Sequence, residues 1–421
     1  MKRPNRHTLA ALTLAAALTL SACRAPSAPP PLAIVTPHPL LSVDAPPCRL
    51  DYDLPYHLSG IVCFERIYDR VTAPEAAPEL GGLTAAPDGT LYVARPATGT
   101  IWAMRDVDGD SFPDAPYQVA GDLPHPTALT FHAGALYVAA EGGLFRLELD
   151  ARGLARRRTQ LAADLTAPSG LWPDSVRVGP DARIYVGVGA RCADCPPQQT
   201  ASGAVLSFAL DGSDRRTVAT GLRHPRALAF HPRSGDLWIA DARGASAPYD
   251  ALFRVSAADL AAERAPDFGY PACVDARAPQ CADVPPPAYT FPDRSTPADM
   301  LFYTADGFPF WQDDLIVTLA GSWNRPEPSG YALAVIGFGA DGLPDGGYER
   351  IAPISDHPNF AFPLARYSLM GMGFFPYHPA ALALDAQGWL YIAEQEGRIL
   401  RIRPRPERAF DPRYPTPTPT P

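Results

Sequence analysis

Short apolar runs that alternate with polar residues recur along this chain. The clearest phrase reads His-Pro-x-Ala-Leu, then a turn, then Leu-[Tyr/Trp]-[Val/Ile]-Ala, and it occurs at 125–139, 224–240 and 378–393. Weaker copies occur at 85–94, 172–186 and 296–317. Such short alternating segments are typical of β-strands, and the Pro-Asp-Gly and Ala-Gly pieces between them are typical of hairpin turns.

Six copies of one unit indicate a repeat architecture. A single copy cannot bury its own apolar face, so the copies must pack on one another. Their spacing of roughly 45 to 80 residues is near the size of a four-stranded propeller blade with insertions. A further β-rich run follows each copy, as at 100–104 and 398–402, and helical periodicity is confined to a stretch near 257–264. We therefore predict an all-β fold, a six-bladed β-propeller, in preference to a pair of β-sandwiches.

The N-terminus has a different pattern. Lys2, Arg3 and Arg6 precede an apolar run that is too short to span a bilayer and that ends in Leu-Ser-Ala-Cys23. This arrangement resembles a bacterial lipobox and predicts a signal peptide at 1–22 and lipidation of Cys23. The alternative is an ordinary signal peptide with a chance cysteine. We expect an extracytoplasmic lipoprotein that meets the membrane through its N-terminal lipid only.

Two Pro-rich segments border the predicted propeller, which we place at 48–408. Residues 23–47 are rich in Pro, Ala and Ser, which predicts an extended linker, and residues 409–421 contain a Thr-Pro alternation, which predicts a disordered tail. The formal net charge is −9, and the sequence has no Lys/Arg-rich face and no nucleic-acid motif. We therefore expect no nucleic-acid partner.

Of the seven cysteines, six remain once Cys23 is assigned to the lipid. An even number in an exported protein favours disulfides. Local spacing favours the pairs Cys48–Cys63, Cys192–Cys195 and Cys273–Cys281. The Cys-x-x-Cys pair at 192–195 also fits a redox or zinc motif, although a thioredoxin-like context and further nearby ligands are missing.

The residue before the proline of each copy is expected near the mouth of the propeller channel. Across the copies this position holds His125, Trp172, His224, Thr296 and His378. Three histidines and an indole at one level predict a polar, aromatic ring. The alternative is that His-Pro merely begins a strand and that each imidazole bonds locally. His231-Pro232 and His357-Pro358, which lie outside the register, favour this alternative.

Alternating carboxylates occur in the segment 106–114. Such a Gly-containing loop can wrap a hard cation such as Ca²⁺. The candidate ligands are Asp106, Asp108, Asp110 and Asp114. The spacing is not that of an EF-hand, because Gly109 comes early and no Glu closes the loop. The alternative is a solvated acidic turn.

Longer segments carry a family resemblance. Residues 221–238 contain Gly-Leu-Arg-His-Pro and Gly-Asp-Leu-Trp, and residues 321–331 contain Gly-Ser-Trp-Asn-Arg and Ser-Gly-Tyr. Together with 179–195 and 302–309, they are similar, in order, to segments of the glucose/sorbosone dehydrogenases, which are sugar dehydrogenases that use pyrroloquinoline quinone (PQQ). The resemblance runs from about 75 to 404. It implies a six-bladed propeller with PQQ and Ca²⁺ at the channel mouth.

The resemblance also implies roles for single residues. Arg223 stands at the family's Gly-Leu-Arg arginine, which neutralises carboxylates of the quinone. The implied contacts with the cofactor are Arg223, His224, Trp172, Trp323, Asn324 and Arg325. The chain departs from the family at the proton acceptor, because the His of a Gly-His-Trp segment is Leu171 here, and Ala320 stands where a His is common. His224 and Asp174 are the candidates for the catalytic base instead.

Three functions follow from these observations. The first is an exported PQQ-dependent dehydrogenase that oxidises an aldose or related carbohydrate by hydride transfer to the quinone. The second is a catalytically silent propeller that binds a small ligand, glycan or protein at the channel mouth. The third is a hydrolytic propeller, such as a lactonase, for which no specific segment is present. We favour the first, with a small carbohydrate and the quinone as partners and a protein partner as an open alternative.

Overall fold

The computed structural model describes residue 48 and residues 62–69, 79–165, 174–190, 202–244, 247–322, 329–352 and 378–404. Several predicted features lie outside these residues: the signal peptide, the linker, the tail, Cys23, Leu171, Trp172, Cys192, Cys195, Trp323, Asn324 and Arg325. The domain boundaries at 48 and 408 therefore stay predictions. Within the described part, no helix is both long enough and apolar enough to cross a membrane.

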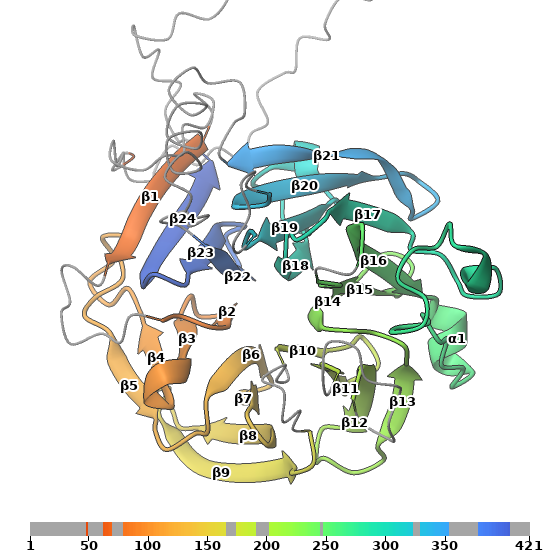
Figure 1. Ribbon diagram of the computed structural model, residues 1–421. Helices are drawn as coiled ribbons and strands as arrows, with labels where there is room; N and C mark the ends of the chain where they lie inside the picture. The colour runs from red at the N-terminus through yellow and green to blue at the C-terminus, as the bar shows by residue number, and fades with distance from the viewer. Residues whose placement is uncertain are drawn as a thin grey trace, which may run out of the picture. The chain divides into compact units, whose positions relative to one another are not determined.

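The described strands form six four-stranded antiparallel sheets in a ring (Figure 1). The predicted six-bladed β-propeller is therefore confirmed. Blades 1 and 2 contain β2 Leu83–Ala85, β3 Leu91–Arg95, β4 Thr100–Met104, β5 Tyr117–Ala120, β6 Pro126–His132, β7 Ala135–Ala140, β8 Gly143–Leu149 and β9 Ala155–Ala162. Blades 3 and 4 contain β10 Ser175–Val178, β11 Arg183–Val188, β12 Ala204–Ala209, β13 Arg216–Ala219, β14 Pro225–Phe230, β15 Leu237–Asp241, β16 Tyr249–Val255 and β17 Tyr289–Pro292. Blades 5 and 6 contain β18 Pro297–Phe302, β19 Leu315–Leu319, β20 Ala332–Phe338, β21 Pro344–Ala352, β22 Pro379–Leu384, β23 Leu390–Glu394, β24 Arg398–Pro404 and β1 Val62–Asp69.

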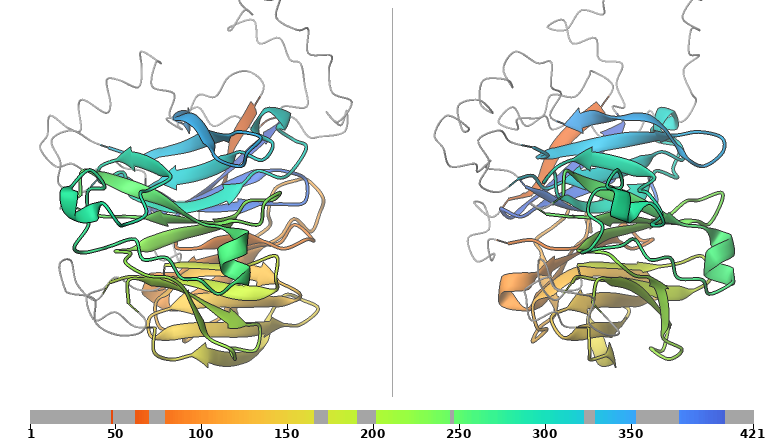
Figure 2. Two further views of the ribbon diagram at one scale, coloured as in Figure 1. Left: turned by 90° about the vertical axis from the view of Figure 1, so that its right-hand side faces the viewer. Right: turned by 45° about the vertical axis from the view of Figure 1, so that its right-hand side comes forward.

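The repeated phrase builds the inner half of every blade. Its first apolar run forms the innermost strand (β2, β6, β10, β14, β18 or β22), and its second forms the neighbouring strand, as Figure 1 shows. Helices are few and short among the described residues: α1 Ala257–Ala261 and the 3₁₀ turns η1 Pro96–Thr98, η2 Pro279–Cys281 and η3 Pro309–Trp311. The predicted helical stretch near 257 is thus confirmed as α1, which lies at the outer edge of the ring (Figure 1) and is the green helix in the side views of Figure 2.

Apolar side chains hold neighbouring blades together. The described residues form six buried clusters, each drawn from two adjacent blades; Tyr92 of β3 and Leu136 of β7, for example, belong to the same cluster. The last of these clusters joins blade 6 to blade 1 through Tyr391 and Val93. Because each blade buries one face against each neighbour, the ring is the unit that provides a complete core.

The ring closes between the two ends of the described chain. Strand β1 pairs antiparallel with β24, from Val62 opposite Pro404 to Asp69 opposite Arg398. The first strand that the structure describes therefore completes the last blade. The sequence pattern did not predict this pairing.

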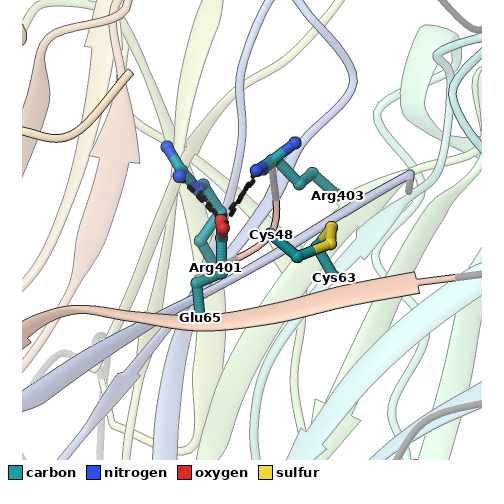
Figure 3. Close-up of a disulfide and its surroundings, with 5 residues drawn as sticks. All are labelled: Cys48, Cys63, Glu65, Arg401 and Arg403. Atoms are coloured by element: carbon teal, nitrogen blue, oxygen red, sulfur yellow. Dashed lines mark hydrogen bonds and ion pairs between the residues drawn. A yellow bond between two sulfur atoms is a disulfide. The ribbon is translucent and has the colours of Figure 1, made fainter. Parts of the chain in front are cut away.

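A buried charge cluster lies at this closure (Figure 3). Glu65 of β1 is fully buried, and its carboxylate accepts hydrogen bonds from Nε and Nη2 of both Arg401 and Arg403, at 2.7–2.9 Å. Next to it, Cys48 and Cys63 form a disulfide, as predicted, and Cys273 and Cys281 form the second predicted disulfide within the described residues. Two guanidinium groups on one carboxylate fix the register of β1 against β24.

Candidate functional site

A cavity of about 200 Å³ lies between the inner strands. All six blades contribute to its lining, through residues such as Leu83, Thr127, Ser175, Arg226 and Ala298. It reaches the end of the ring at which the inner strands begin, where the sequence predicted the channel mouth. Its polar lining is concentrated in blades 2 to 5: His125, Asp174, Arg177, His224, Arg226 and Asp299.

Two of the predicted catalytic candidates face each other in this cavity. His224, just before β14, places Nε2 at 2.8 Å from Oδ2 of Asp174, just before β10. The side chains are 10% and 16% exposed, so both are largely withdrawn from water. The pair brings together residues of blades 3 and 4 that lie 50 positions apart in the sequence.

The electrostatic surroundings keep Asp174 ionised. Burial alone raises the pKa of a carboxyl, but His224, Arg226 and His125 oppose it, and the pKa of Asp174 is lowered below its ordinary value. Arg226 Nε lies 3.6 Å from the same carboxylate oxygen. The cavity therefore holds a fixed negative charge next to an imidazole.

An ion pair between Arg177 and Asp299 crosses the channel deeper in the cavity. Arg177 belongs to β10 and Asp299 to β18, on blades that are not neighbours. Asp299 also accepts hydrogen bonds from the backbone N–H groups of Met300 (2.8 Å) and Leu382 (2.9 Å). Blades 3, 5 and 6 therefore meet at one carboxylate, which forms the floor of the cavity.

Arg223, the arginine of the family resemblance, is held by blade 4 and is not among the described lining residues of the cavity, although its neighbour His224 is. Its backbone N–H donates to both carboxylate oxygens of the fully buried Asp241, at 3.0 and 3.2 Å, and its Nη1 donates to the carbonyl of Ala242 at 3.0 Å. Gly244, at φ 75°, leaves room for the guanidinium: a Cβ there would lie only 2.7 Å from Cζ of Arg223. Arg223 is therefore in a cradle that a larger residue would fill.

The predicted ring of residues at the channel mouth is only partly assembled. His125 and His224 line the cavity, whereas His378 and Thr296 are not among its described lining residues. The His378 ring bonds to Glu396 through Nδ1, and the Thr296 backbone N–H donates to Asp250. Trp172 lies outside the described residues.

The alternative interpretation of His-Pro, an imidazole that bonds locally, holds for His231. Its Nδ1 accepts hydrogen bonds from the backbone N–H groups of Arg233 (3.3 Å) and Ser234 (3.2 Å), and its ring packs against Phe302 and Phe338. The side chain is buried at the far end of β14, so this imidazole is a structural one.

The acidic loop lies away from the cavity, in the turn between β4 and β5. Carboxylate oxygens of Asp106, Asp108 and Asp114 lie within 4.8 Å of one another, and all three residues are exposed. Asp110 instead accepts a hydrogen bond from the backbone N–H of Phe112. The loop docks on blade 6, because the Arg401 guanidinium stacks on Phe112 at 4.7 Å.

Two carboxylates in or behind the cavity lining were not named as candidates from the sequence: Asp299 and Asp241. Asp241, which fixes the backbone of Arg223 and His224, ends the apolar strand β15; a carboxylate at the end of a buried strand was the signal available. Asp299 directly follows Pro297-Ala298 in the weak copy of blade 5, but nothing in the pattern linked it to Arg177, 122 residues away.

Known proteins resemble parts of this chain in sequence. Residues 274–404 match the TrAA12-like family model. An uncharacterized protein of Borreliella burgdorferi is 26% identical over 155 residues, which cover 34% of this chain and 39% of that protein. The chain thus aligns with well under half of the length of this curated relative.

Solved structures share the fold over most of the chain. Iodide and calcium structures of Trichoderma reesei Carbohydrate-Active Enzymes Family AA12 superpose with TM-scores of 0.67 and 0.66 at 14% identity, over 84% of this chain and 99% and 98% of theirs. The holo form of the PQQ domain of pyranose dehydrogenase from Coprinopsis cinerea superposes with a TM-score of 0.65 at 17% identity, over 86% of this chain and 98% of that domain. The predicted resemblance to PQQ-dependent sugar dehydrogenase propellers is therefore confirmed for the fold.

Proposed function

We propose that this chain is a PQQ-dependent sugar dehydrogenase that oxidises an aldose or related carbohydrate by hydride transfer to the quinone. The observation that carries the proposal is the cavity at the start of the inner strands, in which a buried imidazole and a carboxylate face each other. The shared fold with a PQQ domain and the TrAA12-like match support it. The substrate partner would be a small carbohydrate.

Arg223 is the residue that we propose for the carboxylate groups of the quinone. When bound, PQQ supplies a two-electron oxidant, and its carboxylates need cationic partners. Arg223 would meet this need, because a guanidinium pairs with a carboxylate in a bidentate manner, and Gly244 leaves room for the guanidinium where it lies. The contacts of the quinone with Trp323, Asn324 and Arg325 stay predictions. So does a Ca²⁺ ion that would polarise the quinone carbonyl.

A second calcium ion is proposed for the acidic loop, where three aspartates converge. Carboxylate oxygens are the ligands that Ca²⁺ prefers. Adding Ca²⁺ to the chelator-treated protein is expected to raise its melting temperature. The rise should be lost in Asp114→Asn and kept in the exposed control Asp345→Asn. An equal response of both variants would contradict this site.

An N-terminal lipid on Cys23 and an extracytoplasmic location form a further proposal, which rests on the sequence pattern alone. The lipid would hold the propeller at a membrane surface through the Pro-rich linker. Cys23→Ala is expected to move the protein from the membrane fraction to the soluble fraction. A protein that stays with the membrane in this variant would contradict the lipid anchor.

A catalytically silent propeller that binds a ligand at the same mouth is the second candidate. Ala320 favours it, because this residue stands where the family commonly has His, is buried, and donates its backbone N–H to Thr296. Leu171 likewise replaces the family's proton acceptor. A lactonase-type hydrolase has no comparable observation in its support.

Titration of PQQ with Ca²⁺ into the purified full chain separates these candidates. Calorimetry and the quinone absorbance are expected to show one site per chain, and an aldose is then expected to reduce an artificial electron acceptor. Arg223→Ala should weaken binding of the quinone, because it removes a charge-assisted pair. An absence of quinone binding would overturn the dehydrogenase and leave the silent propeller. Binding without turnover of any sugar would favour the silent propeller as well.

A further inference from the structure

The two nitrogens of the His224 imidazole have different surroundings. Nε2 lies 2.8 Å from Oδ2 of Asp174, within ion-pair distance of that carboxylate. Within the described part of the chain, Nδ1 makes no hydrogen bond, although the residue lines the cavity. With the hydrogen on Nε2, the lone pair of Nδ1 is free to accept a proton.

The backbone on both sides of this imidazole is fixed. The N–H of His224 donates to Oδ1 of Asp241 at 2.6 Å, and the carbonyl of His224 accepts from the N–H of Ala242 at 3.0 Å. Asp241 is fully buried, so this clamp is shielded from water. Asp241 is therefore a positioning residue: it holds the segment that carries both Arg223 and His224.

The charges around the pair support a proton acceptor. Asp174 stays ionised despite burial, because His224, Arg226 and His125 lower its pKa. Deeper in the cavity, Asp299 is neutralised by Arg177, and Glu79 completes the titratable lining. Asp174 is thus the carboxylate next to His224, and it would stabilise a positive imidazolium there.

We infer that His224 is the proton acceptor of the sugar oxidation and that Asp174 stabilises its protonated form, in place of the histidine that the chain lacks at Leu171. This inference rests on the proposed dehydrogenase function. The substrate O–H bond breaks and its proton moves to Nδ1 of His224, while the C–H electron pair leaves with the hydride to an acceptor of the quinone class and the carbonyl forms. General-base catalysis of this kind contributes about 10²–10⁴-fold to the rate.

The first test measures the pair without cofactor or substrate. The carboxyl carbon of Asp174 is followed by NMR through a pH titration of the full chain and of His224→Gln. The titration of Asp174 is expected to move to higher pH in the variant. Burial raises the pKa of Asp174, and the His224 imidazole that opposes this effect is then absent. An unchanged titration would overturn the pairing of His224 with Asp174.

The second test measures catalysis. In the PQQ-loaded protein, His224→Gln is expected to lower kcat by about 10²–10⁴-fold with binding of the quinone kept within a few-fold. Asp174→Asn should lower kcat in the same direction and shift the acidic limb of the pH profile. His378→Gln is the matched control, because it occupies the same position of blade 6 but bonds to Glu396 outside the cavity; its kcat should stay near that of the unsubstituted protein.

The outcomes separate the inference from the function on which it rests. Sugar turnover that survives in His224→Gln would overturn the inference and leave the dehydrogenase standing. A chain that binds no quinone and oxidises no sugar would overturn both. Thermal melting of each variant excludes loss of the fold as the cause of a lowered kcat.

Discussion

At the scale of single residues, Gly244 leaves the space that the guanidinium of Arg223 occupies. Gly244 has a left-handed backbone, at φ 75°, and a Cβ there would lie 2.7 Å from Cζ and 2.9 Å from Nε of Arg223. Because any side chain would meet the guanidinium, the glycine serves both the turn after β15 and the placement of the charge.

Gly244→Ala is therefore expected to weaken PQQ binding by at least about tenfold, or ~1.4 kcal/mol, because the displaced guanidinium loses its pairing with the quinone. Gly134→Ala is the matched control: its φ is 76°, but its Cβ would meet nothing within 4 Å. Both variants should lose about 1–2 kcal/mol of stability from backbone strain. Calorimetric titration checks the difference, and equal PQQ affinity in the two variants would contradict the cradle.

Asp250 is a single residue that makes the stability of the folded state depend on pH. It accepts hydrogen bonds from the backbone N–H groups of Arg243 (2.8 Å) and Thr296 (2.9 Å), yet burial raises its pKa to about 6. In the unfolded chain its pKa is about 3.9. As the pH rises from 4 to 6, the unfolded chain releases the proton first, so the folded state loses stability over this window.

We expect the stability of the unsubstituted protein, measured relative to Asp250→Asn, to fall by roughly 2–3 kcal/mol between pH 4 and pH 6.5. Asparagine does not titrate, so the variant lacks this contribution. It also has a single acceptor oxygen, which lowers its stability at every pH. Urea unfolding at several pH values measures the difference, with the exposed Asp341→Asn as control. A difference that stays constant with pH would contradict the raised pKa.

At the scale of elements, the pairing of β1 with β24 decides whether the ring is closed. Glu65 provides both oxygens to Arg401 and Arg403, and all three side chains are buried. Arg401 also stacks on Phe112 and Trp389, at 4.7 and 4.8 Å, so the closure contacts the acidic loop of blade 1 as well. Removal of the Glu65 carboxylate would leave the buried guanidinium groups of Arg401 and Arg403 without this anionic partner.

Glu65→Ala is expected to lower the free energy of unfolding by ~3–5 kcal/mol, the usual cost of breaking a buried ion pair from one side. Faster hydrogen exchange in β1 and β24 than in β14 and β15 should accompany the loss. Glu349→Ala, an exposed substitution on the outer strand β21, should change stability by less than about 0.5 kcal/mol. Similar losses in the two variants would show that the cluster does not hold the closure.

Elements also show which parts of the fold the sequence could reveal. The inner strands carry the His-Pro phrase and its weaker copies, so six blades could be counted from local pattern alone. Strand β1 carries no copy of the phrase, and its partner β24 lies more than 300 residues away, as the separation of 336 residues between Glu65 and Arg401 shows. Charged residues inside an apolar strand, such as Glu65, were the only local sign of a buried partner.

At the scale of the whole molecule, the ring converts distant positions into one site. His224 and Asp174 could be named as candidates from the sequence, because both lie at the start of an inner strand. Their separation of 2.8 Å depends on how blades 3 and 4 pack, which no local pattern fixes. For the same reason His378, equivalent in sequence to His224, bonds to Glu396 outside the cavity.

The ion pair between Arg177 and Asp299 is the contact that most clearly belongs to the closed ring. It joins blades 3 and 5 across the channel, and Leu382 of blade 6 donates its N–H to the same carboxylate. Burial raises the pKa of Asp299, although Arg177 opposes the shift. Such a pair has its full effect only when all three blades are in place.

A double-mutant cycle measures this contact. Arg177→Met and Asp299→Leu are each expected to destabilise the protein by ~3–5 kcal/mol, because each leaves a buried charge without its partner. The double variant should be more stable than the sum of the two losses predicts, since both charges are then removed, with a coupling of about 1–3 kcal/mol by urea unfolding. Losses that add within about 0.5 kcal/mol would mean that the two side chains act independently and that the ring does not depend on a contact across its channel.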